Sequence, residues 1–185
     1  MPTPTISAYL TRAGNDGLRE VIQIFRHDFV QYMGMILSWV TLIEAEAAAV
    51  PDADVAFKAA AAQLQGDTER IFNEASVRLR PDIPDNGDAA QLNLFWETFF
   101  SGFSADTVPT LAALETQTLA LVRQPAFGAL IESSLGAAAE GDSIGGLLLR
   151  PFERLRAMFQ PAIFDARVAE VVNSRHHHDA LPPTA

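Results

Sequence analysis

The chain has 185 residues, of which 49% are hydrophobic and 19% charged, and its formal net charge is −10. This length suits one domain, or at most two small ones, and the apolar content excludes a wholly disordered chain. The absence of cysteine excludes disulfides, thiolate zinc sites and a cysteine nucleophile, and the acidic balance argues against a nucleic-acid or anionic-membrane surface.

Residues 16–49 are predicted to form one long helix, with Asp16 as its N-cap. Apolar residues recur there at steps of three and four, as one face of a helix requires. They are Leu18, Val21, Ile22, Phe25, Phe29, Met33, Ile36, Val40 and either Leu42 or Ile43. Pro51 ends the helix, and residues 1–15 are expected to be flexible. Because a globular helix averages about 11–12 residues, such a long one favours an elongated bundle.

The same spacing predicts further helices over 52–79, 89–103, 106–123, from Pro125 onward, 147–158 and 162–174. A loop rich in proline and aspartate covers 80–88, and a glycine-rich link covers 136–146. Strand signals are almost absent. We therefore expect an all-α, elongated multi-helix bundle as a single domain over 16–174, followed by a disordered tail at 175–185.

No metal-binding or catalytic motif stands out in the sequence. Three histidines are adjacent at 176–178, where neighbouring helical side chains diverge by about 100° and cannot share one ion, and His27 is expected on a helix surface. The glycine-rich segment 141–146 lacks the Gly-Lys-Ser/Thr of a phosphate-binding loop. The aromatic run over 95–103 has the spacing of a core face. We expect no cofactor and no metal.

Membrane signals are also missing. The N-terminus lacks a basic region followed by an apolar one. The longest apolar stretches, such as 33–40, fall far short of the roughly 20 residues that a membrane-spanning helix needs. We therefore expect a cytoplasmic protein without direct membrane insertion.

A segment near the C-terminus, LLLRPFERLRAM at 147–158, is similar to a family pattern that reads roughly Leu-Leu-x-Pro-Val-Gln-Arg-Ile-Pro-Arg-Tyr. The residues that match in place are Leu148, Leu149, Pro151, Arg154 and Leu155. The segment resembles the third conserved region of Dbl-homology domains, the catalytic module of Rho-family guanine-nucleotide exchange factors. Weaker similarities follow the family's order at 19–32, 69–73, 100–114, 124–133 and 166–173. Together they cover nearly the whole chain.

The resemblance implies a module that binds a Rho-family small GTPase and promotes GDP release, without bond-breaking chemistry and without a cofactor. It implies that helices 16–49 and 147–158 lie side by side and share one exposed face. The residues that it assigns to the partner are Asp28, Arg150, Arg154, Arg156 and Asn173.

The chain departs from the family pattern in three ways. Phe29 aligns with the family's first-helix glutamate, so Asp28 is the substitute; Pro161 interrupts a helix that is usually longer; and no pleckstrin-homology domain follows. These departures keep two alternatives open. One is a degenerate Dbl-like binding module without exchange activity, and the other is an unrelated all-α bundle that binds a ligand or regulates another protein.

Overall fold

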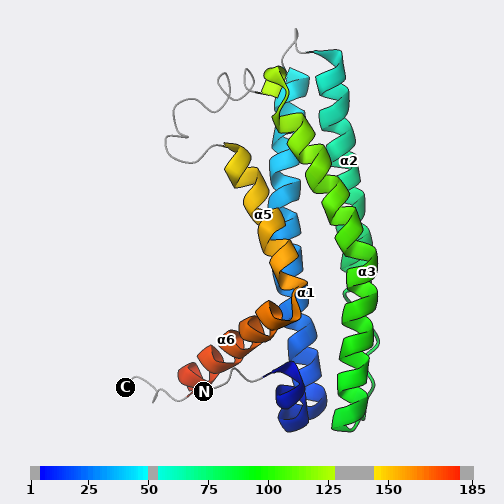
Figure 1. Cartoon of the computed structure of the whole chain (residues 1–185), viewed down its shortest axis with the longest axis vertical. Coiled ribbons are helices and arrows are strands. Elements are labelled where there is room, and N and C mark those ends of the chain that lie inside the picture. Colours follow the sequence, from blue (N-terminus) through cyan, green and yellow to red (C-terminus); the bar gives the residue numbers. More distant parts are fainter. Residues whose placement is uncertain (1–4, 50–53, 128–143, 180–185) are drawn as a thin grey trace.

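The computed structural model describes residues 5–49, 54–127 and 144–179. Its labelled helices are α1 (Ile6–Ala49), α2 (Val55–Arg78), α3 (Ala89–Val122), α5 (Ile144–Met158) and α6 (Pro161–Asp179), and these residues contain no strand. The predicted all-α, multi-helix fold is therefore confirmed. Figure 1 shows an elongated molecule in which α1, α2 and α3 run along the long axis, α5 lies beside α1, and α6 turns outward from the lower end of α5.

Helix α1 is central, because it contacts α2, α3, α5 and α6. The apolar stripe predicted on this helix is buried along its whole length. Ile43 is 4% exposed and Leu42 38%, so Ile43 is the core residue of the two. The buried side chains form one continuous core from Ile6 to Val172.

The N-terminal prediction was wrong for residues 6–15, which are helical. Ile6 and Leu10, one helical turn apart, are both buried, and the backbone N–H of Ile6 donates to Asp165 of α6 at 3.1 Å. The helix kinks at Gly14, whose φ of 61° and ψ of −144° are open to glycine and strained for other residues. The kink lets the first turns contact both α1 and α6.

The predicted helices over 89–103 and 106–123 are one helix, α3. Asp88 begins it with a capping box, accepting from the Gln91 N–H while the Gln91 side chain accepts from the Asp88 N–H. Pro109 lies inside the helix on its exposed side. It removes one backbone donor, but buried residues on both sides of it, such as Thr107 and Leu111, keep the helix on the core.

The C-terminal boundaries also differ from the predicted ones. Helix α5 begins at Ile144 and continues through Pro151, and α6 continues to Asp179, so residues 175–179 of the predicted disordered tail are helical. Residues 180–185, most of the predicted link at 136–146, and the predicted helix from Pro125 beyond Phe127 lie outside the described residues.

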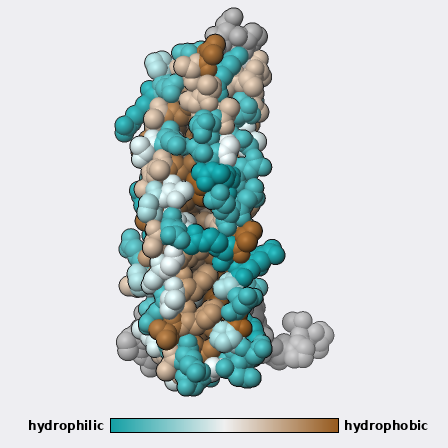
Figure 2. All heavy atoms as spheres, turned by 90° about the vertical axis from the view of Figure 1, so that its right-hand side faces the viewer, coloured by the Kyte–Doolittle hydropathy of each residue, from teal (hydrophilic) through white to brown (hydrophobic). Residues whose placement is uncertain are grey.

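The face formed by α2 and α3 is mixed in character. Figure 2 shows this side of the molecule, with hydrophilic side chains interspersed among scattered apolar ones. The most exposed large apolar residues of these helices include Val77 and Leu94. Within the described part of the chain, no helix combines the length and apolar character needed to cross a membrane.

Phe25 is the centre of an aromatic cluster that joins three parts of the fold. Its ring meets those of Trp96, Phe99, Phe100 and Phe103 on α3, Phe159 between α5 and α6, and Phe164 on α6. The centroids lie 5.2–6.2 Å apart and the planes are steeply inclined, which is a favoured edge-to-face arrangement. We refer to this group as the Phe25 cluster.

We expect Phe25→Ala to lower the free energy of unfolding by about 3–5 kcal/mol, because it leaves a cavity among six rings. Urea denaturation followed by circular dichroism measures the change. Leu94→Ala is the control: its side chain is exposed, so a change within about 0.5 kcal/mol is expected. Equal effects of the two substitutions would contradict the central place of Phe25.

The two glycines Gly14 and Gly66 should respond oppositely to alanine. At Gly14 the positive φ strains any side chain, so Gly14→Ala should cost about 1–3 kcal/mol. Gly66 lies within α2 with open space around an added Cβ, so Gly66→Ala should stabilise by up to about 1 kcal/mol. Thermal unfolding of both variants checks the pair. A stabilising Gly14→Ala would mean that the kink is not required.

Candidate functional site

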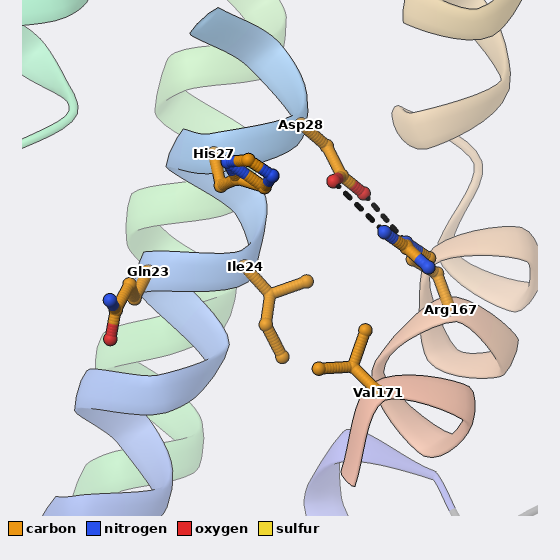
Figure 3. A pocket seen from close by; sticks show the side chains of 6 residues that line it. All are labelled: Gln23, Ile24, His27, Asp28, Arg167 and Val171. Carbon is orange, nitrogen blue, oxygen red and sulfur yellow. Dashed lines mark hydrogen bonds and ion pairs between the residues drawn. The ribbon is translucent and has the colours of Figure 1, made fainter. Parts of the chain in front are cut away.

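The helices α1, α5 and α6 meet around one buried ion pair. Asp28 on α1 has a side chain that is only 5% exposed, and the Arg167 guanidinium on α6 grips it in two places. Arg167 Nε donates to Asp28 Oδ2 at 2.9 Å and Nη2 donates to Oδ1 at 3.2 Å. Figure 3 shows these two bonds closing the space between the helices.

Local sequence explains why both charges are at this junction. Asp28 lies on the buried face of α1, next to Phe29 and one turn after Phe25, so burial of the stripe carries the carboxylate inward. Pro161 occupies the first position of α6, where a proline is tolerated, and it ends the path of α5. Phe164 and Val168 then bury against the core. Arg167, between them on the helix surface, reaches Asp28.

The pair is electrostatically strong on one side and accessible on the other. Hydrogen bonding to the Asp28 carboxylate raises the pKa of Arg167 above its usual value, although partial burial opposes the shift. Arg167 Nη1 also donates to Glu170 at 3.2 Å, and Glu170 is largely exposed. A buried carboxylate is tolerated when such a fork-shaped donor satisfies it.

On one side of the pair is a notch of about 100 Å³ between α1, α5 and α6. We call it the α1–α5–α6 notch, and it is lined by Asp28, Tyr32, Arg154, Ala157, Met158, Ile163, Phe164 and Arg167. Ile163 is 45% exposed and Arg154 is exposed. Among the described residues, no hydrogen bond or ion pair engages the Arg154 side chain. The notch thus offers a cationic group beside apolar surface.

On the other side of the pair is a larger crevice of about 390 Å³ between α1 and α6. We call it the α1–α6 crevice, and it is lined by Gln23, Ile24, His27, Asp28, Arg167 and Val171 (Figure 3). The ion pair therefore separates two hollows of different chemistry. Within the described residues, no group of three metal-ligating side chains gathers here or elsewhere.

The structure brings together two of the predicted partner-contacting residues, Asp28 and Arg154, at the α1–α5–α6 notch. Arg156 faces another way: its Nη1 donates to Glu115 of α3 at 2.7 Å. Arg150 is exposed further up α5. Asn173 lies in a separate small hollow between α6 and the first turns of α1. The five residues do not form one site.

Sequence reasoning missed Arg167, which holds the site together. The available signal was Asp28 itself, since a carboxylate within an apolar stripe predicts a buried charge that needs a partner. The partner could not be chosen by pattern, because Arg167 lies 139 positions away.

Comparison of the chain with protein-family models, with curated proteins and with solved structures finds no match.

Loss of Arg167 should be more damaging than loss of both charges. Arg167→Met leaves an uncompensated carboxylate in the core, and we expect a loss of about 3 kcal/mol in the free energy of unfolding. The double variant Asp28→Asn with Arg167→Met should recover part of that loss. Glu170→Gln, which removes only an exposed partner, should change stability by less than about 0.5 kcal/mol. Additive single losses in denaturant titrations would show that the two groups do not interact.

Proposed function

We propose that this chain is a helical module that binds a Rho-family small GTPase through the face around the α1–α5–α6 notch, and that it binds without promoting GDP release. The proposal combines two supports. One is the ordered series of segments that resemble Dbl-homology regions. The other is the packing of α1 against α5, because the resemblance requires these two helices to lie side by side.

The observation that carries the proposal is the convergence of α1, α5 and α6 on one accessible notch. Arg154 offers a guanidinium without an internal partner among the described residues, and Ile163 offers exposed apolar surface next to it. Protein interfaces favour this combination, in which an arginine and an apolar side chain contact the partner together.

The state of Asp28 favours binding without exchange over exchange itself. An exchange factor must hold the nucleotide-free GTPase more tightly than the GDP-bound form, and only this difference in affinity accelerates release. The carboxylate assigned to that task is buried and held by Arg167. It cannot reach a partner unless the ion pair first opens.

A direct test measures binding and exchange separately on the same samples. Rho-, Rac- and Cdc42-type GTPases loaded with fluorescent GDP are titrated with the protein, and both fluorescence anisotropy and the rate of nucleotide release are followed. We expect saturable binding to at least one GTPase, with release no faster than in buffer. Faster release would replace the proposal with exchange activity, and no binding to any GTPase would overturn both.

Arg154→Glu should weaken that binding by about tenfold or more, because it reverses the charge at the notch. The matched control is Arg70→Glu on α2, which packs against α1 and α3 and not on α5 (Figure 1). It should leave the affinity unchanged. If both variants bind alike, the contact surface lies elsewhere on the molecule.

A further inference from the structure

We propose that the α1–α6 crevice is a binding site for a primary alkylammonium group. The site is independent of the proposed GTPase binding, since no partner protein is needed to form it. Its volume of about 390 Å³ lies within the range of about 300–1,000 Å³ that is typical of small-ligand pockets.

The walls of the crevice suit a short alkyl chain that ends in a polar group. Ile24 on α1 and Val171 on α6 point toward each other across the opening (Figure 3). The Asp28–Arg167 pair closes one end. The exposed polar side chains Gln23 and His27 lie along the α1 edge. An apolar passage therefore leads to a buried, charged end.

The hydrogen-bonding capacity of Asp28 selects a donor. A carboxylate has about four acceptor positions, and in the structure each Asp28 oxygen accepts one bond from Arg167. The side chain is 5% exposed, so bulk water reaches it poorly, yet it lines the crevice. An ammonium group carries three donors and no acceptor, so it matches the remaining positions.

The charge balance also selects a cation. Arg167 bonds to both Asp28 and Glu170, so two carboxylates share one guanidinium. This group of three side chains has a formal charge of −1, in a chain whose net charge is −10. An ammonium ion would neutralise the group, whereas an anion of the same size would be repelled.

The first test uses n-butylammonium as the probe, with n-butyrate and n-butanol as matched controls. The full chain carries ¹³C-labelled isoleucine and valine methyl groups, and the NMR signals of Ile24 and Val171 are followed during each titration. We expect saturable shifts with n-butylammonium and binding at least about tenfold weaker with either control. If the three probes shift these signals alike, or if n-butylammonium gives no saturable shift at millimolar concentration, the crevice holds only water and the proposal fails.

A second arm identifies where such a group could come from. Nα-acetyl-lysine amide presents the same ammonium on a protein-like side chain. Binding comparable to n-butylammonium supports a site that accepts a lysine side chain as well as a free amine. Binding of n-butylammonium alone supports the narrower assignment to small free amines.

Two substitutions at Val171 separate charge from simple contact. Val171 is half-buried, so both a lysine and a glutamate can reach solvent there. We expect Val171→Lys to weaken n-butylammonium binding by about tenfold or more and Val171→Glu to leave it no weaker than in the original chain. Val77→Lys, at an exposed position of α2, controls for the added charge, and circular dichroism verifies folding. Equal weakening by both Val171 variants would overturn the assignment to a cation.

Discussion

The packing of six aromatic rings around Phe25 is the contact on which the arrangement of the other helices depends. Phe25 lies on α1, and its neighbours come from α3, from α6 and from Phe159 at the turn between α5 and α6. Burial of aromatic surface is the largest favourable contribution that a single residue makes to such a core. Because α5 and α6 share the cluster, the turn between them is held at a defined place on α1.

The buried ion pair follows from that packing. Once Phe25 and Phe29 face the core, Asp28 beside them must also be buried, and a buried carboxylate needs a fully formed partner. Arg167 can serve only because Phe164 and Val168 hold α6 against α1. The apolar cluster therefore positions the charged groups, and the charged groups in turn restrict how α6 can lie on α1.

The site is suited to recognition rather than to bond-breaking chemistry. The described residues show an arginine in an apolar notch on one side of the ion pair and a polar crevice on the other. Neither hollow brings a base to a nucleophile, and both are open to solvent at an edge of the bundle. The Asp28–Arg167 pair belongs to both hollows, so an event that opened it would alter the two together.

Local pattern was sufficient to predict the all-α class, the long central helix and its buried stripe, because helical periodicity is a property of neighbouring residues. The same local reasoning wrongly divided α3 and left residues 6–15 flexible. In both places the deciding contacts are tertiary: Thr107 and Leu111 bury on either side of Pro109, and the Ile6 N–H meets Asp165 of α6. The site was decided by tertiary structure alone. Asp28 and Arg167 are 139 positions apart, and only the packing of α6 on α1 turns two separate charges into one buried pair.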